Sequence, residues 1–231
     1  MMQEQRVADA LAQAAIAPIQ SGMLVGLGTG RAAKRGIRAL AERVRTEQLD
    51  IRCVATSNGS EALAQELGLQ LTDFHLVERV DYTFDGADQV DRGTLGVLKG
   101  GGGAMTRERL VAWASDKVVY MVDQSKLSDA LCRDRGLAIA VLAFGLSCTR
   151  AYLRERGVNG VVRRDEDGKL FITDNGNLVL DAHLEDGCDL EQLAAFLNDV
   201  PGVIDHGLFL DEADEIIVET DAGQIERLVR G

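Results

Sequence analysis

The chain has 231 residues, of which 46% are hydrophobic and only 4% aromatic, and its formal net charge is −12. This length is enough for one large domain, or one and a half, around a substantial core. The excess of acidic residues argues against nucleic acid and against anionic membrane surfaces as partners. An anionic ligand would therefore have to be held by positive charge gathered locally in a site.

Cysteine usage and the absence of targeting patterns bear on the compartment. No CxxC spacing occurs among the four cysteines, which are typical of reduced core thiols: Cys53, Cys132, Cys148 and Cys188. The N-terminal residues lack the basic-then-apolar pattern of a signal peptide, and no apolar run approaches membrane-spanning length. The three histidines are scattered, without metal-binding spacing. These features predict a cytoplasmic protein without a metal site.

The first half of the chain alternates predicted helices and strands. An apolar stripe at helical spacing predicts a helix within residues 3–20. Apolar runs then predict strands over 23–27, 50–56, 81–87 and 117–123. Helices are expected over 31–45, 57–68 (stopped by Gly68) and 106–115. This alternation predicts a Rossmann-like, mostly parallel sheet with helices on both faces.

After about residue 132 the pattern changes. Strands are expected over 137–142 and 159–165, a strand pair (171–173 and 178–182) around the turn residues DNGN, and a last strand over 203–207; helices are expected over 146–157 and 189–200. This order is the βαββαβ arrangement of a small ferredoxin-like α+β unit.

The domain boundaries follow from this change of pattern. We expect a catalytic α/β domain formed by residues 1–132 and 207–231, and a small α+β domain formed by residues 133–206. The last stretch, 207–231, is expected to supply one or two strands and a short helix that rejoin the first sheet.

The stretch over residues 85–108 concentrates polar chemistry at the end of a predicted strand, where open α/β sheets bind their ligands. It contains two carboxylates, a lysine, four consecutive glycines and a third acid: Asp85, Asp88, Lys99, Gly100 to Gly103, and Glu108. Four glycines in a row cost conformational entropy, so they indicate backbone N–H groups that approach an anion closely. The alternative, a solvated acidic loop with a glycine linker, is disfavoured by the apolar residues on both flanks.

The helix after the glycines carries a possible general base. Thr106 is the expected N-cap, which puts Glu108 in the first turn, where the helix dipole favours the ionised carboxylate. Lys99 precedes the glycines instead of following them, so this is not a Walker loop. A lysine beside a glycine nest would place charge where a substrate oxygen becomes negative.

A second glycine motif lies near the N-terminus. Gly28-x-Gly30-x-x-Ala33 fits the dinucleotide-binding fingerprint, with Asp50 about twenty residues later, but Asp50 begins a predicted strand instead of ending one. We interpret this motif as a turn whose N–H groups hold a phosphate or hydroxyl, with a tight turn without a ligand as the alternative. Three nearby hydroxyls are either pocket wall or helix caps: Thr56, Ser57 and Ser60.

Several of these segments together resemble ribose-5-phosphate isomerase of the A type. They occur in the same order over nearly the whole chain: VGLGTG (25–30), VATSNGSEALAQELG (54–68), DGAD (85–88), LKGGGGAMTRE (98–108), VDQSK (122–126), TDNGNLVLDA (173–182) and PGVIDHGLF (201–209). The resemblance implies an aldose–ketose isomerase of the pentose phosphate pathway that interconverts D-ribose 5-phosphate and D-ribulose 5-phosphate through an enediolate. It also implies that no metal or organic cofactor is used, and it suggests a homodimer.

The resemblance assigns roles to individual residues. It makes Glu108 the base, gives the sugar hydroxyls and ring opening to Asp85 and Asp88, and gives the oxyanion to Lys99 with the glycine N–H groups. The substrate-binding positions that it implies are Gly28, Thr29, Gly30, Arg31, Asp85, Gly86, Ala87, Asp88, Lys99, Gly100, Gly101, Gly102 and Lys126. Two other interpretations are a non-catalytic sugar-phosphate sensor and an NAD-dependent oxidoreductase.

The sequence departs from the family pattern at two places. Arg31 and Ala32 follow GTG where the commoner form has two hydroxyl residues that bind phosphate. Arg31 therefore either compensates for the lost hydroxyls or signals an altered substrate. The usual Pro-Val-Glu-Val is Ala138 to Val141 here, so Ala140 lacks the acid.

Overall fold

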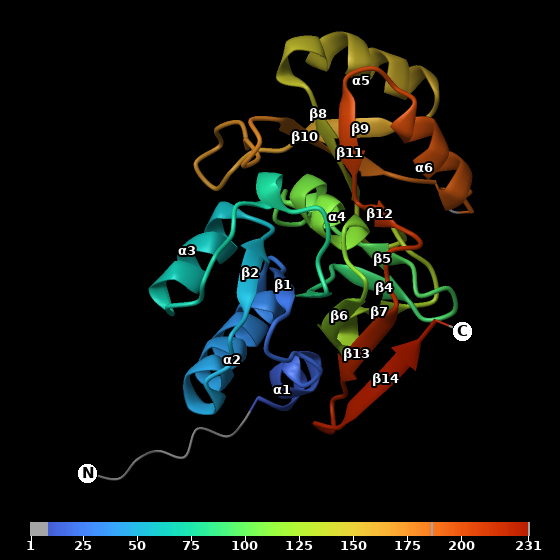
Figure 1. Cartoon of the computed structure of the whole chain (residues 1–231). Coiled ribbons are helices and arrows are strands. Elements are labelled where there is room, and N and C mark those ends of the chain that lie inside the picture. The colour runs from blue at the N-terminus through green and yellow to red at the C-terminus, as the bar shows by residue number, and fades with distance from the viewer. Residues whose placement is uncertain (1–8, 186, 231) are drawn as a thin grey trace.

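The computed structural model describes residues 9–185 and 187–230, which form three β-sheets (Figure 1). The largest sheet has six strands in the order β14-β13-β6-β3-β1-β2. Their bounds are β1 Leu24–Leu27, β2 Arg52–Ala55, β3 Tyr82–Asp85, β6 Val118–Asp123, β13 Glu215–Glu219 and β14 Ile225–Val229. All pairs are parallel except β13 with β14. The predicted Rossmann-like, mostly parallel sheet is confirmed.

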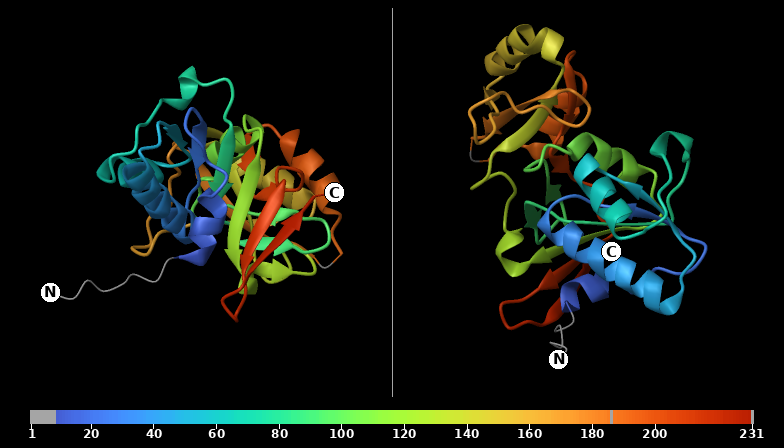
Figure 2. Two further views of the ribbon diagram at one scale, coloured as in Figure 1. Left: turned by 60° about the horizontal axis from the view of Figure 1, so that its bottom comes forward. Right: turned by 90° about the vertical axis from the view of Figure 1, so that its left-hand side faces the viewer.

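Helices cover both faces of this sheet because its central strands are apolar on both sides. Three helices share a core with one face (Figure 2): α1 Ala10–Ile16, α2 Arg31–Glu47 and α3 Asn58–Glu66. The other face packs against α4 Met105–Trp113. Of the helix expected within residues 3–20, positions 3–8 lie outside the described residues, and the helix observed is α1. Gly68, with φ +76°, follows the end of α3 as expected.

A small third sheet lies beside α4 in the order β12-β5-β4-β7. Its strands are β4 Gln89–Asp91, β5 Val97–Leu98, β7 Leu127–Ser128 and β12 Leu208–Phe209. The sequence did not predict them, because two or three residues are too few to show a period of two. These strands hold Asp88 and Lys99 in position, because β4 begins directly after Asp88 and β5 ends directly before Lys99.

The remaining sheet carries two helices, and its chain order is the βαββαβ that was predicted. We call this sheet the four-stranded sheet and, together with its two helices, the four-stranded unit. The elements are β8 Leu137–Val141, α5 Leu146–Glu155, β9 Asn159–Val162, β10 Leu178–His183, α6 Leu190–Asn198 and β11 Val203–His206. The sheet is antiparallel throughout, in the order β11-β8-β10-β9. The strand expected over 171–173 is wrong: only Ile172 forms a single bridge, to Leu178, because the chain turns at once through Asp174 to Gly176.

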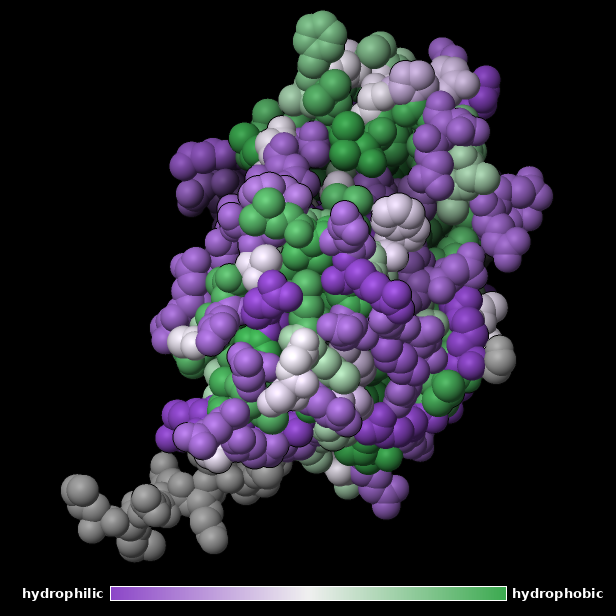
Figure 3. All heavy atoms as spheres, in the orientation of Figure 1, coloured by the Kyte–Doolittle hydropathy of each residue, from purple (hydrophilic) through white to green (hydrophobic). Residues whose placement is uncertain are grey.

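The division into two domains, one formed by residues 1–132 and 207–231 and the other by residues 133–206, stays a proposal. The core of the four-stranded sheet also includes Leu98, Leu131 and Leu208 from outside that range. Figure 3 shows hydrophilic residues over most of one face and apolar residues gathered near its top, where Figure 1 places α5. Exposed apolar side chains of this unit include Phe144 and Tyr152.

The end of the chain differs from its prediction. The described residues of 207–230 contain no helix; β13 and β14 form a hairpin around a turn at Thr220 to Gly223. The expected short helix is therefore wrong, since the register places the last segment as an antiparallel edge strand. β13 itself enters the large sheet beside β6, and its middle residues are fully buried: Ile216, Ile217 and Val218.

The cysteine prediction is half right. Cys53 and Cys132 are buried free thiols, but Cys148 and Cys188 are exposed. Within the described ranges, no helix combines the length and the apolar character needed to span a membrane.

Candidate active site

The candidate site lies where the loops after β1 and β3 leave the sheet. β1 is the point at which strand order reverses, because β2 lies on one side of it and β3 on the other, and ligands of open α/β sheets bind at such points. Gly28 follows β1 and donates its N–H to the Phe84 carbonyl at 2.9 Å. A Cβ on Gly28 would lie 2.5 Å from the Cα of Asp85. Only glycine allows the ends of these two strands to come this close.

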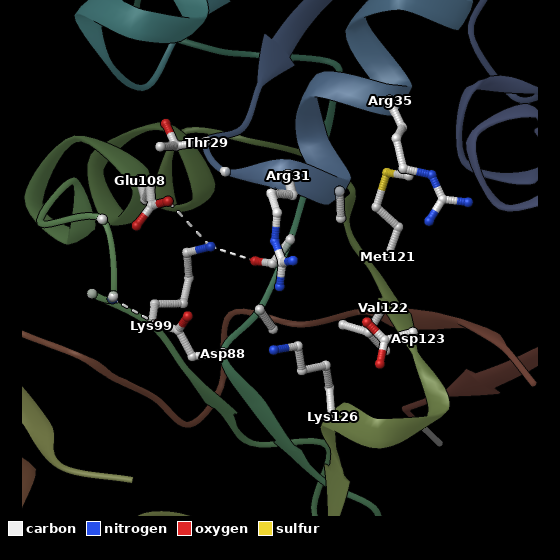
Figure 4. A pocket seen from close by; sticks show the side chains of 17 residues that line it. Thr29, Arg31, Arg35, Asp88, Lys99, Glu108, Met121, Val122, Asp123 and Lys126 are labelled. Carbon is white, nitrogen blue, oxygen red and sulfur yellow. Dashed lines mark hydrogen bonds and ion pairs between the residues drawn. The ribbon is translucent and has the colours of Figure 1, made fainter.

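A buried lysine joins two acids beneath this point. The Nζ of Lys99 lies 2.9 Å from Oδ2 of Asp85. It also lies 3.2 Å from Oε1 of Glu108 and donates to the Gly86 carbonyl (Figure 4). Asp85, Lys99 and Glu108 are 2%, 4% and 6% exposed. The other oxygen of Asp85 accepts from the N–H groups of Thr29 at 2.8 Å and Gly86 at 2.7 Å. Asp85 is thus fully engaged as an acceptor.

The charges of this cluster are set by burial and by one another. Burial raises the pKa of Glu108 to about 8, although the Lys99 ammonium acts in the opposite direction. Burial also opposes charge on Lys99, but the carboxylates of Asp85 and Glu108 hold its pKa above the ordinary value, so it stays protonated. The site therefore contains one cation held by two acids and one carboxyl whose pKa, about 8, lies well above its ordinary value.

Two expectations about Glu108 are corrected by this geometry. The dipole of α4 was expected to keep its carboxylate ionised, but desolvation outweighs that effect and raises its pKa. Thr106 was the expected N-cap, yet α4 begins at Met105 with Ala104 as an N-cap that gives no side-chain bond. Glu108 still lies in the first turn.

The glycine run forms a tight loop above the cluster. Gly100 and Gly103 have φ of +102° and +71°, which favour glycine, and the Gly103 N–H donates to the Gly100 carbonyl at 3.0 Å. The Gly101 N–H donates to Oδ2 of Asp88 at 2.7 Å. The loop and the second acid of the DGAD motif are thereby held together.

These groups border a cavity of about 360 Å³. Of the predicted site residues, Gly28 and Asp85 lie beneath it and are not part of its lining, while the others line it: Thr29, Gly30, Arg31, Gly86, Ala87, Asp88, Lys99, Gly100, Gly101, Gly102, Glu108 and Lys126. The cavity also reaches Ala32, which the sequence marked only as a departure from the family pattern, and Arg35, Met121, Val122 and Asp123, which the sequence did not single out. Arg35 was predictable in principle, because it lies one helical turn after Arg31 on the same face of α2.

Positive charge gathers at one side of the cavity. Arg31 is the first residue of α2, it is exposed, and its side chain points into the cavity near that of Lys126 (Figure 4). Arg35 also lines the cavity but is held by Asp9 at 2.6 Å and Glu219 at 2.8 Å. Because Gly30 gives α2 no side-chain cap, the first N–H groups of the helix add to this positive region. This is the local charge that an anion requires in a chain of net charge −12.

Comparison with known proteins identifies the family. Residues 52–223 match the sequence profile of the family described as ribose 5-phosphate isomerase A (phosphoriboisomerase A). This chain belongs to the ribose-5-phosphate isomerase A family. Ribose-5-phosphate isomerase A of Gluconobacter oxydans is 43% identical over 206 residues, which are 89% of each chain.

Solved structures of the same class agree with the fold. Ribose 5-phosphate isomerase A from Methanocaldococcus jannaschii has a TM-score of 0.90 at 33% identity, covering 95% of this chain and 96% of that one. A D-ribose-5-phosphate isomerase in complex with phospho-erythronic acid has a TM-score of 0.90 at 31% identity, covering 99% and 100%. The fold and the isomerase class predicted from the sequence are confirmed.

In this member of the ribose-5-phosphate isomerase A family, the nearby hydroxyls support the loop and do not line the cavity. Ser57 caps α3 by accepting from the Ser60 N–H at 3.1 Å. Ser60 donates to the Gly28 carbonyl at 2.6 Å, and Thr56 donates to the Leu27 carbonyl at 3.0 Å. Thr56 also contacts the Thr29 hydroxyl at 2.7 Å. Of the two alternatives left open by the sequence, helix capping applies to Ser57, whereas Thr56 and Ser60 neither cap the helix nor line the cavity but bond to backbone carbonyls after β1.

Two further sequence features are placed by the fold. Asp50 precedes β2, at the end of the sheet opposite to the candidate site, so the acid of the dinucleotide fingerprint is not where a cofactor ribose would lie. Ala140 is fully buried in β8, opposite Val179 and Asp205.

Among the residues described, no group of three or more His, Cys, Asp or Glu is arranged to hold a metal ion.

Proposed function

We propose that this isomerase interconverts D-ribose 5-phosphate and D-ribulose 5-phosphate. The observation that supports this most is the lysine shared by two buried acids at the edge of a cavity whose other side is positively charged. The family relationship and the solved complex with phospho-erythronic acid agree with a sugar-phosphate ligand. We further propose a place in the pentose phosphate pathway, a cytoplasmic location, a homodimer and no requirement for a metal or organic cofactor.

In the proposed reaction Glu108 moves a proton between two carbons. It takes the proton from C2 of the open aldose, and the electron pair of that C–H bond forms the C1=C2 double bond while the carbonyl oxygen becomes an oxyanion. Return of the proton to C1 and transfer of a hydroxyl proton then give the ketose. Because Oε1 of Glu108 lies 3.2 Å from Nζ of Lys99, a turn of Glu108 toward the substrate carbon would free an ammonium N–H for the oxyanion.

The two acids of the DGAD motif have different surroundings, which supports different roles. Asp88 lines the cavity and is half-buried, so we assign it to the sugar hydroxyls, to ring opening and to relay of hydroxyl protons. The resemblance gives Asp85 the same task, but its oxygens already bind Lys99 and two N–H groups. We therefore propose that Asp85 acts chiefly by holding Lys99 charged and in place.

Arg31 should hold the phosphate at the start of α2. Its guanidinium can make charge-assisted, bidentate bonds to a phosphate whose other oxygens meet the helix N–H groups. Such binding is equal in the ground and transition states. We expect Arg31→Ala to raise KM for ribose 5-phosphate about 10- to 100-fold, equivalent to about 1.5–3 kcal/mol, with a much smaller change in kcat.

The matched control for this variant is Arg38→Ala, which removes an exposed arginine of α2 that does not line the cavity. Its KM should stay at the native value. Unphosphorylated ribose provides a second control, because its use should be unaffected by Arg31→Ala. An unchanged KM for the phosphorylated sugar would show that Arg31 is only a surface residue.

The dependence of kcat/KM on pH should report the buried carboxyl. Glu108 has a pKa of about 8 in the free enzyme, and only its deprotonated form accepts a proton from carbon. The value of kcat/KM should therefore rise about tenfold per pH unit below pH 8 and level off above it. Steady-state kinetics between about pH 6 and pH 9 measure this limb. A flat profile, or the same limb in the residual activity of Glu108→Gln, would rule out Glu108 as its source.

A single assay tests the proposed function. Formation of ribulose 5-phosphate from ribose 5-phosphate is followed with and without prior dialysis against a chelator. Equal rates in the two samples support a metal-free isomerase, and a loss restored by a divalent metal contradicts that mechanism. Binding of the sugar phosphate without turnover would instead favour the sensor, and turnover that needs NAD would favour the oxidoreductase.

A further inference from the structure

Arg163 contacts the glycine loop from the side away from the large sheet. It directly follows β9 of the four-stranded sheet and is only 15% exposed. Its Nη1 donates to the carbonyl of Gly100 at 2.7 Å and to that of Gly101 at 3.1 Å. One guanidinium thus binds two consecutive carbonyls of the loop that borders the candidate site.

These two contacts determine where the next N–H groups point. In a trans peptide the C=O and the following N–H point in opposite directions. The Gly100 carbonyl faces Arg163, and the Gly101 N–H of the same peptide unit accordingly points the other way, to Oδ2 of Asp88 at 2.7 Å. By the same rule, the Gly102 N–H points away from Arg163, and Gly102 lines the cavity. In the described part of the chain, this N–H has no acceptor.

The guanidinium is itself held in place by two further side chains. Its Nε donates to Oδ2 of Asp181 at 2.9 Å, and its Nη2 binds the other oxygen of that carboxylate. The guanidinium lies 5.5 Å from the centre of the Phe171 ring. Phe171 also packs against the loop, since a Cβ on Gly103 would lie 2.4 Å from an atom of its ring. The four-stranded unit therefore supports the glycine loop through a rigid, paired cation.

We propose that Arg163 is a positioning residue of the reaction. It orients the Gly101–Gly102 peptide so that the Gly102 N–H is aimed at the oxyanion of the substrate, and its charge on the carbonyl side polarises that N–H further. This inference rests on the proposed isomerisation, because it names the residue that aligns the N–H groups of the glycine loop with the oxyanion. It also gives the four-stranded unit a task in catalysis, although none of its residues lines the cavity.

Replacement of Arg163 tests the proposal. Arg163→Met keeps the length of the side chain but donates no hydrogen bonds, and we expect kcat to fall about 10- to 100-fold while KM for ribose 5-phosphate changes less than about threefold. Arg163→Lys keeps the charge and should fall between the native enzyme and Arg163→Met. Arg164→Met is the matched control: this neighbouring arginine is largely exposed, donates to the Gly168 carbonyl and should leave kcat unchanged.

A binding measurement separates positioning from mere stabilisation. Phospho-erythronic acid carries a carboxylate that mimics a planar oxyanion, so its affinity for Arg163→Met should drop by the same factor as kcat, while Arg164→Met should bind it normally. If Arg163 only links the two sheets, the melting temperature falls but kcat per folded molecule and the affinity for phospho-erythronic acid do not. That outcome would overturn the proposal.

Two further arms keep the test decisive. Should Arg163→Met fail to fold, Arg163→Lys and Asp181→Asn give the answer, because each loosens the guanidinium contacts and should lower kcat in the folded protein; native kcat in both would also overturn the proposal. A native protein that does not isomerise ribose 5-phosphate would refute the proposed function instead, and the phospho-erythronic acid comparison would still report on Arg163.

Discussion

Glu108→Gln should lower kcat by roughly 10²- to 10⁴-fold, or more, while the substrate still binds. The amide keeps the shape of the side chain and can still accept a bond from Lys99, but it cannot take a proton from carbon. Stopped assays at saturating ribose 5-phosphate measure the loss, and calorimetric titration with phospho-erythronic acid measures the binding that remains. A variant with near-native turnover would show that another group is the base.

The stability of the same variant provides an internal control. The folded pKa of Glu108, about 8, lies above its ordinary value of 4.5. The stabilisation associated with the protonated form is therefore complete below the unfolded pKa and is lost as the pH rises through about 8. Gln cannot ionise, so the melting temperature of Glu108→Gln should exceed that of the native enzyme by a margin that grows from about pH 6 to about pH 8 and then levels off. A lower melting temperature at high pH would mean that the loss of activity reflects damage to the fold.

Lys99→Met should be the second severe change, with kcat lowered by about 10²- to 10³-fold. It removes the electrophile of the proposed reaction and leaves Asp85 buried without its cation, a loss that costs about 3–5 kcal/mol of folding free energy. Turnover and chemical denaturation of the same preparation measure the two effects. The control is Lys117→Met, because Lys117 is more than one-third exposed and pairs with Glu215 at 3.5 Å outside the cavity.

A double variant separates the two consequences. In Lys99→Met/Asp85→Asn the buried acid is neutral as well, so most of the lost stability should return while turnover stays low. Recovery of activity together with stability would contradict the electrophilic role, because it would show that Lys99 only neutralises Asp85.

The sequence predicted the main sheet and most of the side chains that gather at its ligand-binding edge, because both rest on strong local signals. Apolar runs separated by amphipathic helices determine a parallel sheet, and Asp85 must then end a strand at the ligand-binding edge. The glycine run before Glu108 has no structural purpose in a helix or strand, so it indicated a ligand loop. The burial that binds Lys99 to both acids was not predictable, since it depends on β5 and α4 packing in three dimensions.

The missed features have few local signals. β4, β5, β7 and β12 are too short for periodicity, and the helix expected near the C-terminus became β14 because pairing with β13 outweighed local preference. Thr106 has no capping role because α4 begins directly after the glycine loop, with its N-cap at Ala104, two residues earlier than expected. Arg163 could not have been found at all from spacing, since it reaches Gly100 from a position 63 residues later.

The position of β13 has a consequence for how the polypeptide is made. β6 can pair on one side with β3 as soon as both have left the ribosome, but its other side pairs with a strand from near the end of the chain. Until residues 215–219 are synthesised, β6 is a long apolar edge strand of the kind that recruits other chains. The whole four-stranded unit is translated during that interval. The nascent chain therefore exposes one unpaired edge of its central sheet until almost the entire polypeptide has been made.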